Sequence, residues 1–292
     1  MTSLCIHSFA KLNIALDVLD RRPDGYHNIE SVVQTISLHD DVVISKRRDN
    51  VISVTTNDPS LPPGSGNLAY RACVMFLEAA GLSAGVNIEI SKDIPAQAGL
   101  GGGSSNAAAT VTGLNELFGN PLKNPKLWEI CAALGSDAPL FLVGGTAFVS
   151  GRGEIVEPLP DMVLDFVIVK PDIGVPTTWA YSRLEADRRL QYASRAVAQA
   201  VRLGDNEQVV RGAHNDFWEI VEQAFPEIGA VWADIAGAGA DKALLAGSGS
   251  AVLGVFLDAE GCDAAHDRLK VRYPRVFRAR TMPRRESSLL GG

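Results

Sequence analysis

The chain has 292 residues, a formal net charge of −7, 46% hydrophobic residues and 21% charged residues. This composition is typical of a globular protein with a substantial core, and the length leaves room for two packed domains. The acidic balance provides no general basic surface, which argues against a nucleic-acid-binding protein.

The first half of the chain alternates between strand and helix patterns. Period-two alternation predicts strands, and spacing of three and four residues predicts helices. We expect strands at 4–9, 12–19, 28–38, 42–45, 51–55 and 86–90, a turn at 22–25, and helices at 67–80, from about 106, and at 125–134.

The second half returns to strands at 146–169, is mostly helical over 177–236, and has two short strands at 243–245 and 251–257. The glycine-rich turn at 247–250 lies between those last two strands. The order predicts an α+β protein with a boundary near 151–161. Because Ser-Ser and Gly-Gly pairs occur in it, we expect the tail at 286–292 to fray.

Three consecutive glycines, Gly101 to Gly103, directly precede a predicted helix. With Ser104 or Ser105 as the N-cap, free backbone N–H groups and the helix dipole would favour a phosphate at the helix start. The alternative is a tight connection without a ligand. No lysine follows the glycines, so the segment is not a P-loop, and the last glycine of the dinucleotide fingerprint is missing. The uncharged stretch 94–115 contains too many glycines and polar residues for a membrane span.

The four cysteines, Cys5, Cys73, Cys131 and Cys262, are widely separated and have apolar neighbours. This spacing predicts buried thiols and neither a disulfide framework nor a metal site. No group of His, Cys or carboxylate residues has metal-site spacing. No targeting signal is recognisable near the start, so we expect a cytoplasmic protein.

Four segments resemble the motifs of the GHMP kinases, a family of small-molecule kinases. They are residues 95–109, residues 10–16 with 22–31, residues 135–142, and residues 246–254, in the order of the family. The resemblance implies a two-domain fold. An N-terminal ATP-binding domain of the ribosomal protein S5 domain 2-like type would span residues 1–155, and a smaller α/β domain residues 156–292. It also implies an active site in the cleft between them.

Phosphoryl transfer to an alcohol needs a group to accept the hydroxyl proton and positive charge beside the phosphate. Asp137 and Lys11 lie within the matching motifs, and the resemblance implies that they are the catalytic pair. Each also has a plain structural interpretation, Asp137 as a helix cap and Lys11 as a solvated lysine at a strand end. Asp137 would act either as a full base or mainly by orienting the hydroxyl.

The resemblance assigns ATP, with Mg²⁺ held mostly by phosphates and waters, to the glycine-rich loop and no protein ligand to the metal. The residues of that loop are Pro95, Ala96, Gln97, Ala98, Gly99, Leu100, Gly101, Gly102, Gly103, Ser104 and Ser105. Gln97 stands where many members have a further glycine. The turn at 247–250 would support the cleft, or it could be only a hairpin.

The resemblance also implies a small-molecule substrate linked to cytidine diphosphate, because Tyr26 and His27 match an element that binds the cytidine in some members. Asn13 shares the strand face of Lys11, and Tyr181 would stack on the base, with Trp179 as its competitor. Core packing is the alternative for both rings. Two other functions remain open, a kinase for another alcohol such as homoserine or mevalonate, and a catalytically silent nucleotide-binding regulator.

Overall fold

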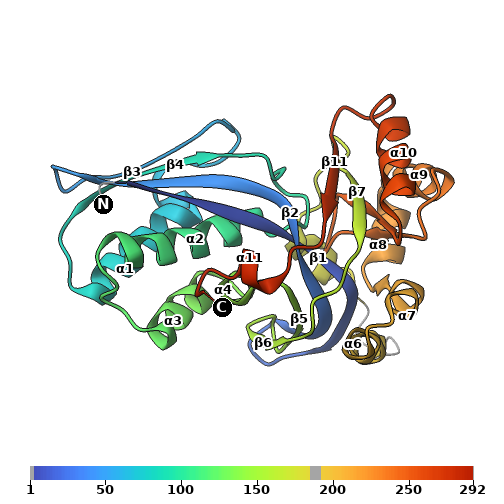
Figure 1. The fold of residues 1–292 in the computed structure, drawn as a ribbon, viewed down its shortest axis with the longest axis horizontal. Coiled ribbons are helices and arrows are strands. Elements are labelled where there is room, and N and C mark those ends of the chain that lie inside the picture. The colour runs from blue at the N-terminus through green and yellow to red at the C-terminus, as the bar shows by residue number, and fades with distance from the viewer. Residues whose placement is uncertain (1–2, 185–191, 292) are drawn as a thin grey trace.

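The computed structural model describes residues 3–184 and 192–291, which form two β-sheets with helices packed on them (Figure 1). The seven-stranded first sheet has the order β3-β4-β2-β1-β8, and β5 pairs with β2 and with β6. Its strands are β1 (Ser3–Arg21), β2 (His27–Arg47), β3 (Ile52–Thr56), β4 (Gly85–Ser91), β5 (Thr146–Ser150), β6 (Ile155–Pro158) and β8 (His214–Asn215).

The second sheet has four strands in the order β11-β7-β10-β9. All of its neighbours pair antiparallel. They are β7 (Asp165–Val169), β9 (Lys242–Leu245), β10 (Val252–Phe256) and β11 (Val276–Arg280). An isolated bridge between Ile36 and Thr281 connects β2 to the segment after β11.

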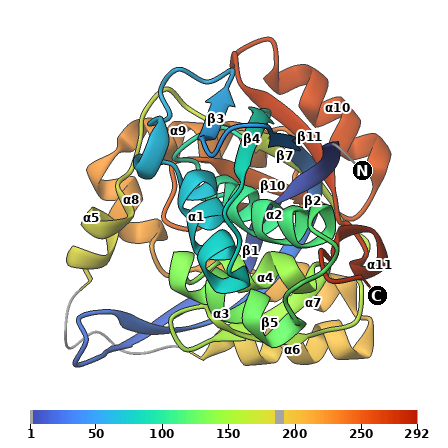
Figure 2. The same cartoon turned by 90° about the vertical axis from the view of Figure 1, so that its left-hand side faces the viewer.

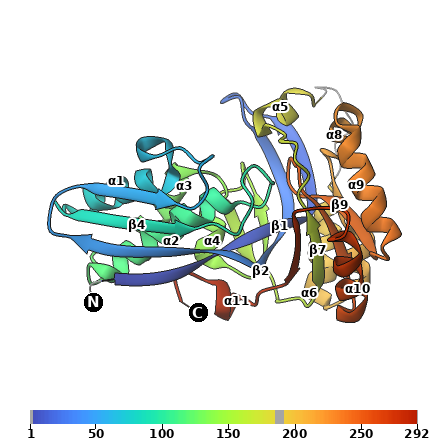
Figure 3. The ribbon, with the colours of Figure 1, turned by 90° about the horizontal axis from the view of Figure 1, so that it is seen from above.

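The helices divide between the two sheets. In Figures 2 and 3, α1 to α4 lie on one side of the first sheet, whereas α8 to α10 lie beside the second. Their bounds are α1 (Leu68–Ala80), α2 (Gly102–Leu117), α3 (Asn124–Leu134), α4 (Ala138–Val143), α5 (Thr177–Ser182), α6 (Ala193–Leu203), α7 (Asn206–Gly212), α8 (Trp218–Ala224), α9 (Pro226–Gly237), α10 (Ala259–Leu269) and α11 (Arg284–Ser287), with a short 3₁₀ turn at Gly64–Gly66.

The core consists of three clusters of buried apolar side chains. One fills the space between the first sheet and α1 to α4, and includes Phe76, Ile88 and Leu114. A second lies between β1, β2 and the second sheet. The third joins the second sheet to α8, α9 and α10. Because β1 and β2 contribute to all three clusters or border them, these two long strands connect the halves of the molecule.

Several sequence predictions are confirmed. α1 begins where Asn67 caps it, the Asn67 side chain accepting a hydrogen bond from the Ala69 N–H, and it ends at Gly81 in the left-handed region. α3 stops at Gly135 as expected. β9 and β10 flank the turn at 247–250 and pair with each other. The helical stretch 177–236 is interrupted by β8, and its residues 185–191 lie outside the described part.

Other predictions were wrong. The strands expected at 4–9 and 12–19 are one continuous β1, and those at 28–38 and 42–45 are one β2, because β-bulges let a long strand bend without ending. The helix predicted from about residue 106 begins at Gly102. Its N-cap is Gly101, so neither Ser104 nor Ser105 caps it.

The tail and one cysteine also differ from expectation. Residues 284–287 form α11, where the buried Ser287 hydroxyl accepts a hydrogen bond from the Gly145 N–H, and the Leu290 N–H donates to the Leu142 carbonyl. The tail is therefore packed up to this point. Cys73, Cys131 and Cys262 are buried, but Cys5 is exposed because it lies on the side of β1 that faces away from α2. The proposed division at residue 155 falls at the start of β6 and stays a prediction.

Candidate active site

A large cleft of about 2050 Å³ lies where the two halves meet. Its walls come from β1, the turn between β1 and β2, the loop that precedes α2, the start of α4, and the segment around α5. The predicted residues Lys11, Asn13, Tyr26, His27, Asp137, Tyr181 and 95–104 all line it. Ser105 lies behind this wall and is fully buried. The structure thus brings together motifs that are far apart in the sequence.

The glycine-rich loop is held tightly against its surroundings. Gly99 has φ +79°, and a Cβ there would come within 1.9 Å of the Ala246 carbonyl oxygen, so the loop touches the turn at 247–250. Gly101 has φ +73°, and a Cβ there would come within 3.0 Å of Lys11 Cγ. No side chain could replace either glycine without displacing a neighbour. The turn is therefore a support of the loop as well as a hairpin.

The first N–H groups of α2 have no partner within the helix, as at every helix start. Gly102, Gly103 and Ser104 carry them, and all three residues line the cleft. Together with the helix dipole they form a place for an anion. The Lys11 N–H donates to the Leu100 carbonyl, 3.0 Å away, which fixes β1 beside this loop.

Lys11 and Asp137 meet across the cleft floor. Lys11 Nζ lies 3.6 Å from Asp137 Oδ2, and the two side chains are 7% and 44% exposed. Asp137 stands at the N-cap position of α4, but its carboxylate does not cap that helix. Lys11 lies in the middle of β1 and is buried, so it is not a solvated lysine at a strand end. The plain structural interpretations of both residues are wrong.

Asn13 orients the lysine. Its Oδ1 accepts a hydrogen bond from Lys11 Nζ at 2.7 Å, and its Nδ2 donates to Ser31 Oγ at 2.8 Å. The Ser31 hydroxyl in turn donates to the Ala15 carbonyl. These hydrogen bonds fix the lysine ammonium beside the Asp137 carboxylate. The sequence had not pointed to Ser31 as part of the site.

Aromatic rings form another part of the cleft wall. The rings of His27 and Tyr181 are stacked, with centroids 5.3 Å apart, and Phe217 meets Tyr181 edge-on at 4.9 Å. Burial, with a further contribution from the negative charge of Asp137, raises the pKa of Tyr181. Its hydroxyl therefore stays protonated at neutral pH. Trp179 instead packs against Phe225 and lines a separate pocket beside α8.

Tyr26 is 55% exposed at the tip of the turn between β1 and β2. Its N–H donates to Asp24 Oδ1, and the Arg152 guanidinium lies 5.0 Å from its ring centroid. Arg152 also lines the cleft, yet no sequence motif drew attention to it. It adds a positive charge to the end of the cleft that holds the aromatic rings.

A second network lies beneath the loop and was also missed. Asp40 accepts hydrogen bonds from the Asp93 and Ile94 N–H groups and from Asn106, and it pairs with Lys92. Asn106 donates as well to Ser8, whose hydroxyl donates to Ser105. These contacts fix the segment that leads into the glycine-rich loop. Asp40 and Lys92 are 52 residues apart in the sequence and lie outside the recognised motifs, so only the fold reveals the pair.

Comparison with known proteins identifies the family. Residues 67–145 match the profile of the GHMP kinases N terminal domain. A 4-diphosphocytidyl-2-C-methyl-D-erythritol kinase of Pelotomaculum thermopropionicum is 38% identical over 274 residues, which are 93% of this chain and 96% of that protein. The chain belongs to the GHMP kinases. A second 4-diphosphocytidyl-2-C-methyl-D-erythritol kinase, from Moorella thermoacetica, is 38% identical over 97% of this chain and all of its own.

Solved structures of GHMP kinases share the fold. A crystal structure of 4-(cytidine 5'-diphospho)-2C-methyl-D-erythritol kinase superposes with a TM-score of 0.79 at 31% identity, covering 95% of this chain and 98% of its own. A homoserine kinase from Cytophaga hutchinsonii has a TM-score of 0.75 at 18% identity, covering 98% and 96%, which shows a common fold alone. The expected two-domain α+β fold class is thereby confirmed.

Membership in the GHMP kinases makes ATP the co-substrate of this chain. In the described residues, 3–184 and 192–291, no helix has both the length and the apolar character needed to cross a membrane. The uncharged stretch at 94–115 is accounted for by the glycine-rich loop and the mostly buried α2.

Proposed function

We propose that this chain transfers the γ-phosphoryl group of ATP to the 2-hydroxyl of 4-diphosphocytidyl-2-C-methyl-D-erythritol, a step toward isoprenoid precursors, in the cytoplasm. The relatives that carry this name match nearly the whole chain. The single observation that supports the chemistry most directly is the Lys11–Asp137 pair, which lies at the floor of the cleft beside the start of α2.

In this proposal the glycine-rich loop, residues 95–105, holds the ATP phosphates. The free N–H groups at the start of α2 and its dipole stabilise negative charge on them. Carboxylate and hydroxyl oxygens line the cleft, and such hard donors suit Mg²⁺, which would neutralise phosphate charge when bound with ATP. We assign it no protein ligand, because phosphates and waters supply most of its coordination.

Asp137 accepts or orients the proton of the attacking hydroxyl, since its half-exposed carboxylate faces the cleft. Lys11 places a fixed positive charge beside that carboxylate and the transferring group. Asn13 and Ser31 keep the lysine in position through the hydrogen bonds described above. The catalytic effect is therefore one of positioning and electrostatics, as phosphoryl transfer requires.

The cytidine of the acceptor would bind at the aromatic end of the cleft. Tyr181 and His27 present stacked rings there, and base–aromatic stacking contributes about 1–3 kcal/mol per base. Tyr26 and Arg152 stand at the mouth, where the guanidinium could meet a diphosphate oxygen. This arrangement supports Tyr181 over Trp179 as the residue that contacts the base.

The experiment is ATP consumption by the purified chain with 4-diphosphocytidyl-2-C-methyl-D-erythritol, homoserine or mevalonate, with the phosphorylated product identified by mass. We expect transfer to the cytidine compound alone. Transfer to homoserine or mevalonate would keep the kinase and overturn the acceptor site. Binding of ATP without transfer to any alcohol would instead indicate a nucleotide-binding regulator.

A further inference from the structure

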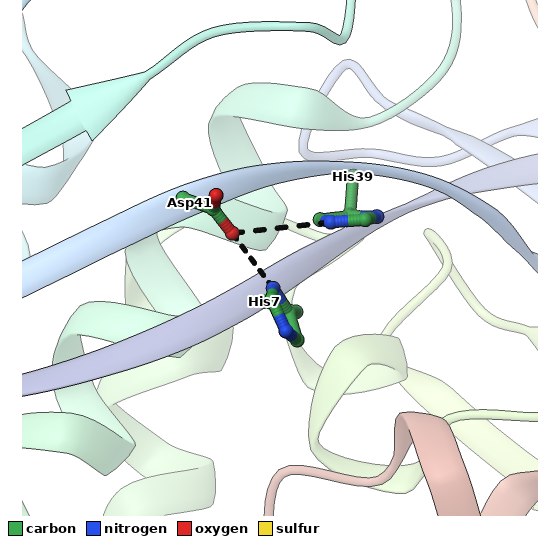
Figure 4. Close-up of side chains that lie close together, drawn as sticks. All are labelled: His7, His39 and Asp41. Carbon is green, nitrogen blue, oxygen red and sulfur yellow. Dashed lines mark hydrogen bonds and ion pairs between the residues drawn. The ribbon is translucent and has the colours of Figure 1, made fainter.

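Two histidines and an aspartate lie close together on β1 and β2 of the first sheet (Figure 4). His7 lies on β1 directly opposite Asp41 on β2, and His39 is two residues before Asp41. Ser8 and Asp40, the neighbours of these residues, face α2, so alternation places His7, His39 and Asp41 on the opposite face. None of these three residues is among the described residues that line the cleft.

The three side chains present their polar atoms to a common point. His7 Nδ1 lies 2.7 Å from Asp41 Oδ1, and His39 Nε2 lies 3.9 Å from the same oxygen. One potential ligand atom from each residue lies within 4.8 Å of the other two. Ligands of a tetrahedral Zn²⁺ stand about 3.4 Å apart, given bonds of about 2.0–2.2 Å. The observed spacings bracket that value, so small side-chain rotations suffice.

The tautomer of His39 leaves a lone pair directed at the cluster. Its Nδ1 lies 2.8 Å from the Ser37 carbonyl oxygen, and because a carbonyl only accepts, Nδ1 must carry the proton. In the neutral ring Nε2 is then an acceptor that faces another acceptor, Asp41 Oδ1. Two facing acceptors repel each other unless a proton donor or a cation lies between them, and a metal ion can take that position. The hydrogen bond at Nδ1 is also the usual second contact of a metal-bound histidine.

Neighbouring rings hold the two imidazoles in place. His7 and His39 meet edge-on with centroids 4.6 Å apart, and Phe9 packs at 5.4 Å from His39. These contacts reduce the number of rotamers that the rings can adopt. The ligand atoms are therefore partly pre-organised before any ion arrives.

A second cluster of histidine and aspartate side chains differs because its histidine nitrogens are already hydrogen-bonded. In the cluster of Asp17, His214 and Asp216, both ring nitrogens of His214 are engaged, one with Asp17 and the other with the Gly212 carbonyl. Asp17 also accepts the Ser194 N–H, and its side chain is fully buried. No lone pair of His214 is left for a metal. The cluster on the outer face differs because it is open to solvent.

We infer that His7, His39 and Asp41 bind a divalent transition-metal ion of the Zn²⁺ type, with water in the remaining position. Imidazole nitrogens favour Zn²⁺, Ni²⁺ and Cu²⁺, whereas Mg²⁺ and Ca²⁺ prefer oxygen ligands alone. The bound ion would link β1 to β2 at the point where the inner face of β2 carries Asp40, the anchor of the glycine-rich loop. The site is separate from the Mg²⁺ that accompanies ATP.

The test is calorimetric titration of the chelator-treated full chain with Zn²⁺, followed by Co²⁺ titration with visible absorption to report coordination. We expect one ion per chain, release of protons, and binding that weakens as the pH falls, because protons compete for the imidazoles. Millimolar Mg²⁺ should not compete. H39A should weaken Zn²⁺ binding by about 100-fold or more, since even outer contacts of a metal site contribute about 10–100-fold.

The matched control is Cys5→Ser, which alters a soft ligand on the same exposed face but outside the cluster. It should leave Zn²⁺ affinity unchanged, and circular dichroism should show that both variants remain folded. Unchanged affinity in H39A, or loss of binding in Cys5→Ser, would overturn the proposed site. Because these readouts need no turnover, their failure is distinguishable from failure of the kinase proposal.

Discussion

The first half of the molecule holds two lysine–aspartate pairs that differ in how their groups are used. Asp40 is fully buried, and besides Lys92 it accepts hydrogen bonds from two backbone N–H groups and from Asn106. Asp137 is 44% exposed and lies 3.6 Å from Lys11. The oxygens of Asp40 are all committed to the fold, whereas the carboxylate of Asp137 remains accessible from the cleft.

This difference separates a structural ion pair from one available for chemistry. A buried charge is tolerated only when it is paired and hydrogen-bonded, and the Lys92–Asp40 network meets that requirement. The Lys11–Asp137 pair has a long contact and a partly solvated carboxylate, so little folding free energy depends on it. Substitutions at the two aspartates should therefore affect different properties of the protein.

The largest expected effect is on turnover in Asp137→Asn. Loss of the proton acceptor should lower kcat by about 100- to 10,000-fold, the usual range for a general base, while the urea midpoint stays unchanged. The matched control is Asp93→Asn, an exposed aspartate that also lines the cleft and should keep near-normal turnover. Near-normal turnover in Asp137→Asn would remove Asp137 from the mechanism.

The opposite pattern is expected for Asp40→Asn. Breaking a buried pair by neutralising one partner should lower the free energy of unfolding by about 3–5 kcal/mol, measured by urea denaturation. Asp41→Asn changes the next residue on the exposed face, where ion pairs contribute about 0–1 kcal/mol, and so serves as the control. Equal destabilisation by the two variants would contradict the distinction drawn here.

Tyr181 and Trp179 are the two aromatic candidates for contact with the cytosine base, and substitution of each distinguishes a binding ring from a packing ring. Tyr181→Leu should raise the KM for the cytidine substrate by roughly 5- to 150-fold, equivalent to about 1–3 kcal/mol of lost stacking, with little change in the KM for ATP. Trp179→Leu should leave both KM values unchanged, because Trp179 packs against Phe225 instead. A larger KM effect from Trp179→Leu would reverse the assignment.

The smallest expected effect is a pH dependence of stability from a third pair, Asp17–His214. Burial alone would lower the pKa of His214, but hydrogen bonds to Asp17 and to the Gly212 carbonyl outweigh it and raise that pKa above 6.5. Burial alone would raise the pKa of Asp17, but hydrogen bonds from His214 and Ser194 outweigh it and lower that pKa below 3.8. The stabilisation by the Asp17–His214 pair is therefore greatest between pH 3.8 and pH 6.5.

The contribution of His214 is complete below pH 6.5 and is lost as the pH rises through its raised pKa, whereas that of Asp17 is lost as the pH falls through its lowered pKa. We expect His214→Gln to be destabilised relative to the parent chain by about 1 kcal/mol more at pH 5 than at pH 9. Urea denaturation at both pH values measures this difference. An equal loss at the two values would show that His214 acts through packing alone.

The local elements were largely predictable from the sequence. Helical spacing predicted α1 at 67–80 and α3 at 125–134, each within one residue of the observed bounds. Strand boundaries were less accurate, because β-bulges in β1 and β2 preserve pairing across irregular stretches that alternation alone interprets as breaks. The prediction of a serine cap for α2 was wrong because a left-handed Gly101 occupies the N-cap position and offers no side-chain oxygen, so the first N–H groups of the helix stay free.

By itself, the sequence determined the motifs and hence the kinase family, because Lys11, Asp137 and the glycine-rich loop occur in segments of recognisable order. Tertiary structure alone decided which charged groups are committed to the fold and which remain accessible. Asp40 and Asp41 are adjacent in the sequence, yet one is buried in a network and the other faces solvent beside two histidines. Burial and partners depend on strand register and on packing against α2, contacts between residues that are distant in the chain.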